Sequence, residues 1–174
     1  MEIKPIHVIF FYVIQINCYP VKSSLIKGKD SDTEALIISE RNNRIKTEDG
    51  FLELNMVYNR NNRSFTFDFI YSDQDWIYFD STKILMFLFN DSNYYALKNI
   101  NKTVYSTDNP NNLFNAHCKI PLPNEFLRKI IDQKIYGIRL NGKYKFKEYE
   151  NGIAKMESRW EKMIYDIKKN DTGL

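Results

Sequence analysis

Few residues of this 174-residue chain have the chemistry and spacing of a catalytic group. The most suggestive pair is His117 and Cys118, because a cysteine nucleophile needs a base within hydrogen-bonding reach. These residues lie in the extended apolar segment 113–123, and adjacent residues of a strand point to opposite faces of the sheet. The two side chains are therefore not expected to contact each other. We predict no catalytic residue and no enzymatic activity. The open alternative is a hydrolase that uses two carboxylates distant in sequence.

Three aspartates, Asp73, Asp75 and Asp80, could supply oxygen ligands to a calcium ion. Asp73 and Asp75 are spaced i, i+2 as in a calcium loop, but no glycine or glutamate completes the motif. The sequence also lacks the CxxC and HxxxH spacings that are typical of metal sites. We therefore predict no metal site and no cofactor, and we expect these aspartates to be solvated turn residues.

Lys143, Lys145 and Lys147 form the candidate polyanion-binding set. Their alternation predicts a strand with a basic face, and aromatic residues such as Phe146 and Tyr149 are expected on its other face. A polyanion such as a glycosaminoglycan could bind the basic face. Alternatively, the lysines protect an exposed edge strand from aggregation. The net charge of +3, with both signs interspersed, is too small to favour nucleic acid, so no nucleic-acid partner is expected.

The N-terminal segment has the features of an export signal. Residues 6–14 are an apolar run that is too short to span a bilayer, which needs about 20 apolar residues. The polar segment 19–34 follows, and its serine, glycine, lysine and aspartate content predicts a flexible tether. The alternative is that residues 6–16 form a β-strand of the fold, because valine, isoleucine, phenylalanine and tyrosine favour strands.

Cys18 lies at the end of the apolar run, where bacterial lipoproteins are cleaved and acylated. The four residues before it read IQIN, whereas the usual motif begins with leucine and ends in two small residues. The leader and tether, residues 1–34, resemble those of surface lipoproteins of Lyme-disease spirochaetes, which tolerate looser motifs. The resemblance implies that Cys18 carries a lipid that anchors the chain to a membrane. It also implies export to the bacterial envelope, outer membrane or cell surface.

The sequence contains two cysteines, so a disulfide is a further alternative for Cys18. If Cys18 is neither acylated nor removed, an oxidising compartment would allow it to pair with Cys118. If Cys18 is acylated or removed, Cys118 is expected to be a small buried hydrophobic residue.

The body of the chain is predicted to be mainly strands. Hydrophobic residues make up 43% of the sequence, which is enough for a real core. Segments 51–58 and 64–71 alternate apolar and polar residues across a turn, which predicts a β-hairpin. Further short strands are expected in 76–79, 84–89, 94–97 and 102–123, each separated from the next by turn residues.

The pattern changes to helix after Pro123. Residues 124–133 have helical spacing, a hairpin with an Asn141-Gly142 turn follows, and an amphipathic helix of roughly 17 residues ends the chain. We therefore predict an α+β fold, an antiparallel β-meander sheet with two C-terminal helices packed on one face. The side chains expected in its core include Phe65, Phe67, Phe69, Trp160 and Ile164.

The expected domain organisation is a signal or lipoprotein leader (1–18), a tether (19–34) and a single α+β domain (35–174). The predicted function is that of an exported, lipid-anchored envelope protein with a non-enzymatic binding domain for a protein or polyanionic ligand. The alternative is a cytosolic structural or regulatory subunit in which residues 6–16 form a strand. The sequence makes no prediction of oligomeric state.

Overall fold

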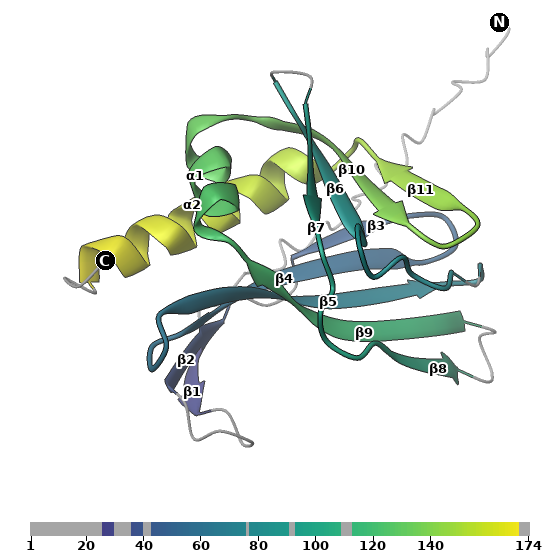
Figure 1. The fold of residues 1–174 in the computed structure, drawn as a ribbon, viewed down its shortest axis with the longest axis horizontal. Coiled ribbons are helices and arrows are strands. Elements are labelled where there is room, and N and C mark those ends of the chain that lie inside the picture. The colour runs from purple at the N-terminus through teal and green to yellow at the C-terminus, as the bar shows by residue number, and fades with distance from the viewer. Residues whose placement is uncertain are drawn as a thin grey trace, which may run out of the picture.

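The computed structural model describes residues 26–29, 36–39, 43–75, 77–90, 93–108 and 113–170. Nine strands come first along these residues, and both helices lie in the C-terminal part, separated by two further strands (Figure 1). In chain order the elements are β1 (Ile26–Lys29), β2 (Leu36–Ser39), β3 (Arg44–Lys46), β4 (Phe51–Asn59), β5 (Ser64–Asp73), β6 (Leu85–Phe89), β7 (Tyr94–Leu97), β8 (Val104–Asp108), β9 (Leu113–Leu122), α1 (Asn124–Asp132), β10 (Ile135–Asn141), β11 (Phe146–Tyr149) and α2 (Ile153–Asn170).

The described strands form two antiparallel sheets. The larger sheet has seven strands in the order β1-β2-β4-β5-β9-β8, with β3 paired to β4. The smaller sheet has four strands in the order β11-β10-β6-β7. The chain leaves the larger sheet after β5, builds β6 and β7 of the smaller sheet, and returns as β8 and β9. The predicted α+β fold with antiparallel strands and helices packed on the sheet is confirmed, and the division into two sheets adds to it.

The β4–β5 hairpin shows how the alternating sequence produces a core face. Leu54 lies opposite Phe69 and Met56 lies opposite Phe67, so that apolar side chains stack across the two strands. All four side chains are fully buried. The intervening turn contains Arg63 with a positive φ of 53°, a conformation that short polar turns accommodate. The predicted hairpin is confirmed.

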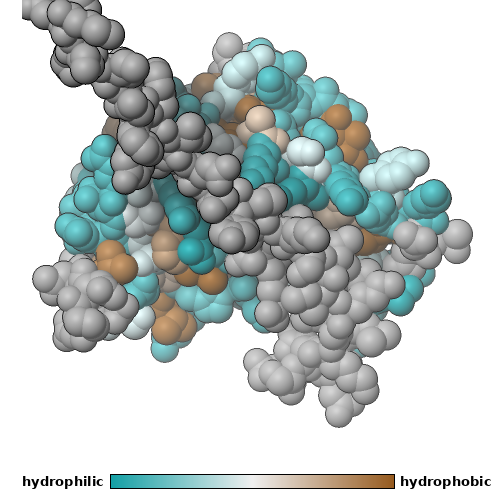
Figure 2. Space-filling view, turned by 180° about the vertical axis from the view of Figure 1, so that it is seen from behind, coloured by the Kyte–Doolittle hydropathy of each residue, from teal (hydrophilic) through white to brown (hydrophobic). Residues whose placement is uncertain are grey.

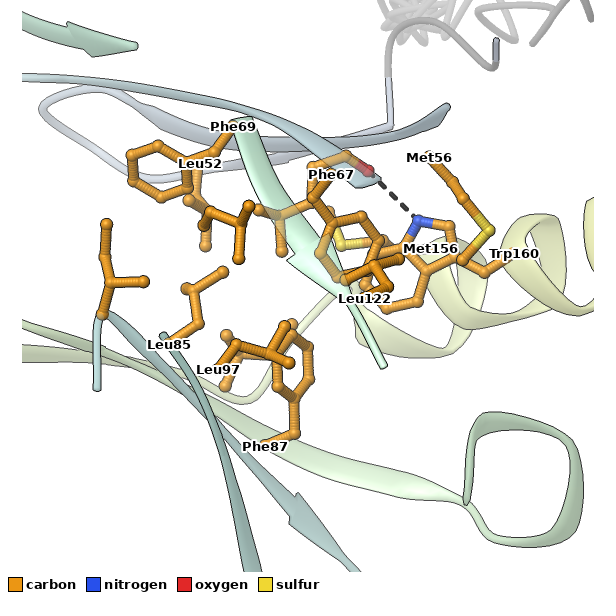
Figure 3. Close-up of a cluster of buried hydrophobic side chains, with 14 of the residues drawn as sticks. Leu52, Met56, Phe67, Phe69, Leu85, Phe87, Leu97, Leu122, Met156 and Trp160 are labelled. Atoms are coloured by element: carbon orange, nitrogen blue, oxygen red, sulfur yellow. Dashed lines mark hydrogen bonds between the residues drawn. The ribbon is translucent and has the colours of Figure 1, made fainter. Parts of the chain in front are cut away.

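The core lies between the larger sheet on one side and the smaller sheet with both helices on the other (Figure 3). The ring of Phe67 in β5 marks its centre. Its centroid lies 6.2 Å from that of Phe87 in β6, 6.0 Å from that of Phe126 in α1, and 4.7 Å from that of Trp160 in α2. Aromatic pairs at these separations stabilise the packing beyond the area that they bury.

The residues predicted to form the core are buried. Confirmed in this way are Phe65, Phe67, Phe69, Trp160 and Ile164.

The outer edge of β4 is paired in two pieces, which fixes the position of α2. β3 pairs with residues 51–53 and β2 with residues 57–59. Between them, the backbone N–H of Leu54 donates to the carbonyl of Asn43 (2.9 Å), and the carbonyl of Leu54 accepts from Nε1–H of Trp160 (3.1 Å; Figure 3). Buried backbone groups need such partners. The gap between β2 and β3 therefore brings β3 and α2 side by side.

Both helices begin where the sequence predicts. α1 follows Pro123, whose fixed backbone angle suits a helix start. α2 buries one apolar stripe against the core, and no helix in the described part of the chain is long and apolar enough to cross a membrane. The buried stripe consists of Ile153, Met156, Trp160, Met163, Ile164 and Ile167.

Two local expectations were wrong. Residues 26–29, within the predicted tether, form β1, which pairs with β2 and extends the larger sheet. The composition of the segment predicted a flexible tether. The prediction failed because an antiparallel neighbour close in sequence satisfies the backbone groups of this segment. Phe79 forms an isolated bridge to Gly142 where a short strand, 76–79, was expected. The leader, residues 1–18, lies outside the described residues. The remaining tether residues, 19–25 and 30–34, also lie outside them, and so does Trp76 of the expected strand 76–79.

Candidate anion-binding pocket

A basic pocket lies between β3 and the start of α2. Its volume is about 290 Å³, close to the lower end of the range for small-molecule sites. Among the described residues, its lining includes four cationic side chains and no acidic one. The lining consists of Asn43, Arg44, Lys46, Gly152, Lys155, Met156 and Arg159, and these residues are called the basic pocket below.

Charge distinguishes this pocket from a second cavity. Seen from behind the view of Figure 1, the described surface is mostly hydrophilic, and hydrophobic residues appear in separate patches (Figure 2). A second cavity, of about 100 Å³, lies beside Gly137 and is lined by both signs of charge, with Arg139, Glu148 and Glu150. The basic pocket is therefore the stronger candidate for binding a charged ligand.

Arg44 is held in a defined orientation. Its Nε and Nη2 groups donate to Oε2 of Glu53 at 2.8 and 2.6 Å, and its guanidinium carbon lies 3.8 Å from the centroid of the Phe51 ring. Glu53 is only 5% exposed, so the carboxylate of this charge-assisted pair is shielded from water, while Arg44 stays exposed at the pocket. The Nη1 group forms no hydrogen bond to the described part of the chain. That leaves donors of Arg44 for a ligand, because guanidinium has five N–H groups.

Asn43 connects the two walls of the basic pocket. Its backbone N–H donates to Oδ1 of Asn55 (3.0 Å), and its Nδ2 donates to the carbonyl of Met156 in α2 (3.2 Å). Its Oδ1 accepts a longer hydrogen bond from Nη1 of Arg159 (3.4 Å). Asn43 is 1% exposed, and Asn55 in turn donates to Glu53 (2.6 Å). A buried polar network of this kind fixes β3 relative to α2 and so preorganises the pocket.

The N-terminal end of α2 forms the other wall. Gly152 has a φ of +82°, which glycine adopts without strain and other residues adopt rarely. The first turn of α2, which follows at once, contains no acidic residue. Backbone N–H groups at a helix start lack partners within the helix and favour negative charge nearby. They add to the attraction that the side chains of the pocket exert on an anion.

Lys46 and Lys155 are the two cations that remain available. Lys46 is exposed at the end of β3 and Lys155 is exposed in the first turn of α2. Neither forms an ion pair with any residue that the structure describes. Their ammonium groups can therefore approach a ligand without first losing a carboxylate partner.

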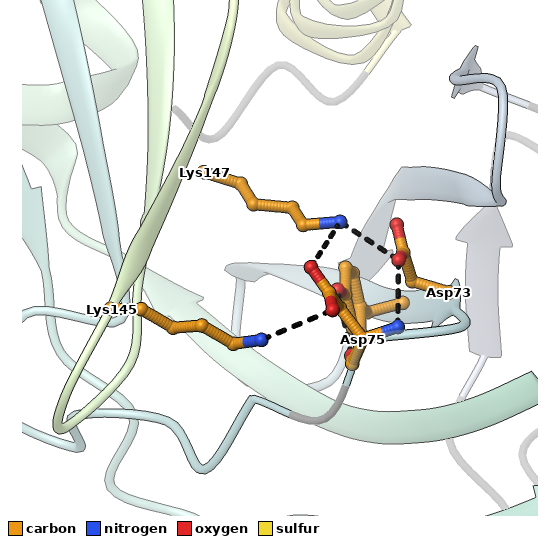
Figure 4. Close-up of polar contacts among 5 residues, drawn as sticks. Asp73, Asp75, Lys145 and Lys147 are labelled. Atoms are coloured by element: carbon orange, nitrogen blue, oxygen red, sulfur yellow. Dashed lines mark hydrogen bonds and ion pairs between the residues drawn. The ribbon is translucent and has the colours of Figure 1, made fainter.

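The lysines predicted from the sequence behave differently (Figure 4). Lys147 lies 2.8 Å from Asp73 and 3.4 Å from Asp75, and Lys145 lies 3.4 Å from Asp75. These ion pairs tie β11 of the smaller sheet to the end of β5 in the larger sheet. Lys143 is exposed and forms no ion pair within the described residues. The set Lys143, Lys145 and Lys147 thus does not present a continuous basic face.

The predicted faces of β11 were also wrong. Lys147 and Tyr149 point inward, toward the larger sheet, whereas Phe146 and Glu148 are exposed. Residues 143–145 belong to the turn, so that the alternation begins only at Phe146. Burial and the neighbouring Asp73 raise the pKa of Tyr149, which keeps its hydroxyl neutral.

The aspartates predicted as solvated turn residues do not share one environment. Asp73 is only 1% exposed, whereas Asp75 is exposed, and its two lysine neighbours lower the pKa of the Asp75 carboxyl. Oδ1 of Asp80 accepts hydrogen bonds from Thr82, which lower the pKa of the Asp80 carboxyl. No group of metal-ligating side chains occurs among the described residues.

His117 and Cys118 point to opposite faces of β9, as expected. His117 is exposed and its Nε2 lies 2.6 Å from Oδ1 of Asp68, whereas Cys118 is buried. Burial raises the pKa of the Cys118 thiol to about 11. A thiol with that pKa is not a reactive nucleophile at neutral pH. Cys18, the predicted lipidation site, lies outside the described residues.

No protein-family model matches the chain, and no curated protein or solved structure matches it either. The assignment of a site therefore depends on the geometry of the basic pocket alone.

Sequence reasoning missed this pocket because its residues come from two distant segments. Arg44 and Lys46 are spaced i, i+2 on a strand, and Lys155 and Arg159 are spaced i, i+4 on a helix. Each spacing predicts two cations on one face of its own element. Nothing in either segment indicates that β3 and α2 lie side by side, which depends on the gap along the edge of β4.

Proposed function

We propose that this chain is the binding domain of an exported, lipid-anchored envelope protein, and that it binds an anionic ligand in the basic pocket without catalysing a reaction. The observation that carries the proposal is the meeting of four cationic side chains at one cavity, where no acidic side chain is found among the lining residues that the structure describes.

The arrangement favours a bound anion for a physical reason. Lys46 and Lys155 form no ion pair with the residues that the structure describes, and the repulsion between like charges gathered at one cavity is relieved when an anion enters. Arg44 and Asn43 are already held by buried hydrogen bonds, so little side-chain entropy is lost when the ligand binds. The binding free energy should weaken with salt, because part of the pocket is open to water.

A binding role fits the residue types better than a catalytic role. Lysine and arginine side chains are protonated at neutral pH and attract negative charge, but they do not accept protons there. The described lining contains no histidine, cysteine, serine or carboxylate that could act as a base or nucleophile.

Calorimetric titration with a fully sulfated disaccharide at low salt tests the anion-binding proposal. Lys46→Gln/Lys155→Gln removes the two available cations and should weaken binding by at least about tenfold, because each charge-assisted contact contributes more than an ordinary hydrogen bond. Lys143→Gln/Lys168→Gln changes the net charge equally at two exposed lysines outside the pocket. Equal losses in both double variants would mean that only overall charge matters, and the proposal would fail.

Export and lipid anchoring are supported by the apolar run 6–14 and by Cys18 at its end. Intact-mass analysis of the protein from its native cells, with Cys18→Ala alongside, tests this part. We expect a mature chain that begins at an acylated Cys18 and a Cys18→Ala protein without lipid. An unprocessed chain that begins at Met1 would instead favour the cytosolic regulatory subunit, with residues 6–16 as a strand.

A further inference from the structure

The basic pocket continues along one face of α2. Lys155 and Arg159 line the pocket, and Lys162 and Lys169 follow at i+7 and i+14 from Lys155. With about 3.6 residues per turn, these four residues lie in one row along the helix. The row lies outside the buried apolar stripe of α2, and its three lysines are exposed. The four residues Lys155, Arg159, Lys162 and Lys169 are called the basic row below.

The basic row is longer than a compact anion. With a rise of about 1.5 Å per residue, Lys162 lies about 10 Å along the axis from Lys155, and Lys169 lies about 21 Å from it. A single sulfate or phosphate group held near Lys46 and Lys155 cannot also reach these positions. A ligand that contacts the pocket and the row together must be extended and must carry several negative charges.

Acidic groups reduce the positive charge of the row only in part. Asp166 lies within the row, between Lys162 and Lys169, so four cations face one carboxylate of the same helix. Glu161 lies about a third of a turn away. Glu157 is buried and accepts a hydrogen bond from the backbone N–H of Ile135 (2.7 Å), so it points away from the row.

The acidic group on the neighbouring strands also leaves the positive charge in place. Glu53 is committed to Arg44, and β3 adds Lys46 at the far side of the pocket. Glu48 and Asp49 are exposed in the turn after β3, so the excess of positive charge lies along the described lining of the pocket and along the row itself.

The residue types in the pocket help to identify the polyanion. Proteins that bind single-stranded nucleic acid combine cations with aromatic side chains on which bases stack. The described lining of the basic pocket contains no aromatic residue. Beside the row, Tyr165 is the one aromatic side chain of α2 outside its buried stripe, so this surface offers few rings on which bases could stack. Lysine and arginine with so little stacking surface suit a chain whose charged groups project from non-aromatic rings.

We propose that the basic pocket and the basic row together bind a linear sulfated polysaccharide. The pocket holds one sulfated unit, and Lys162 and Lys169 contact units further along the same chain. This inference rests on the proposed function, since it requires that the pocket bind anions.

Titrations with heparin-derived oligosaccharides of two lengths, a disaccharide and an octasaccharide, test the inference. The octasaccharide should bind the wild-type protein at least about tenfold more tightly, because it can release counterions along the whole row. Lys162→Gln/Lys169→Gln should remove this gain and leave the disaccharide affinity unchanged. Lys143→Gln/Lys168→Gln is the matched control, since Lys168 lies on another face of α2. Thermal melting of each variant checks that the fold is retained.

The possible results separate the inference from the proposed function. Equal affinity of the wild-type protein for both lengths would overturn the role of the row and leave anion binding in the pocket intact. Absence of binding at either length would overturn both. A single-stranded DNA oligonucleotide of matched length and charge should compete poorly, and competition equal to that of the octasaccharide would overturn the polysaccharide in favour of nucleic acid.

Discussion

Replacement of Trp160 with phenylalanine probes the contact that positions α2. Trp160 is fully buried against Phe67, and its Nε1–H donates to the carbonyl of Leu54 in the gap along β4. Phenylalanine keeps an aromatic ring but lacks this donor and several ring atoms. The change therefore removes a specific hydrogen bond while the site stays apolar.

The expected loss follows from two contributions. A buried carbonyl left without a partner costs about 1–3 kcal/mol. The smaller ring leaves a cavity whose cost is about 1–2 kcal/mol, less than that of a full truncation to alanine. We expect the free energy of unfolding to fall by about 3 kcal/mol, which is a large part of the total for a domain of this size.

Urea unfolding followed by far-UV circular dichroism measures this difference. Tyr165→Phe is the matched control, because Tyr165 lies on the same helix and is 66% exposed. That variant should stay within about 0.5 kcal/mol of the wild type. If Trp160→Phe also stayed within about 0.5 kcal/mol of the wild type, the reasoning would be refuted, because the hydrogen bond to Leu54 would then contribute little to the docking of α2.

Three further predictions concern stability, and urea unfolding measures each. Asp73→Asn should lower the free energy of unfolding by about 2–3 kcal/mol, since it removes a buried carboxylate from a lysine pair; Asp75→Asn, at an exposed carboxylate, should have a far smaller effect. Burial raises the pKa of Cys118 from 9.0 to about 11, so the folded state keeps a proton that the unfolded chain loses. This thiol should therefore contribute a fall in stability of about 1 kcal/mol between about pH 9 and pH 10. The buried tyrosines Tyr71 and Tyr149, whose pKa values are also raised, add to the fall in both proteins, so Cys118→Ala should reduce the slope without abolishing it. Gly50→Ala should cost about 2–3 kcal/mol, because a methyl group there would overlap the backbone of β5; Gly137→Ala, where the added atom meets only ordinary contacts, should be tolerated better.

The elements with strong periodicity were predictable from the sequence. Segment 64–71 places Phe65, Phe67 and Phe69 on one face, and only a strand with one buried face accommodates that pattern. The stripe that includes Trp160 and Ile164 likewise fits a helix alone. These are local patterns, and the elements that they predict agree with the structure to within a few residues.

The arrangement of these elements was less predictable. β5 pairs with β9, about 50 residues later, because the intervening chain builds part of the second sheet. The turn residues between β5 and β6 give no indication of which sheet the next strand joins. Long-range pairing depends on how whole faces pack, and no short window of sequence contains that information.

The candidate site was the least predictable feature. Lys145 and Lys147 alternate with aromatic residues in the sequence, yet aspartates from another strand neutralise them. Arg44 and Lys155 show no local motif, yet the fold brings them to one cavity. Charge balance at a surface depends on residues from several elements, so clusters of like charge in sequence are weak guides to binding sites.

Mapping a bound anion by amide chemical shifts tests the central claim most directly. Titration of labelled protein with the fully sulfated disaccharide should shift the amides of residues 43–46 and 152–159 together, with one dissociation constant. The amides of residues 143–147 should stay unchanged, because their lysines are paired or lie outside the pocket. Shifts centred on residues 143–147, or no shifts at low salt, would contradict the assignment of the basic pocket as an anion-binding site.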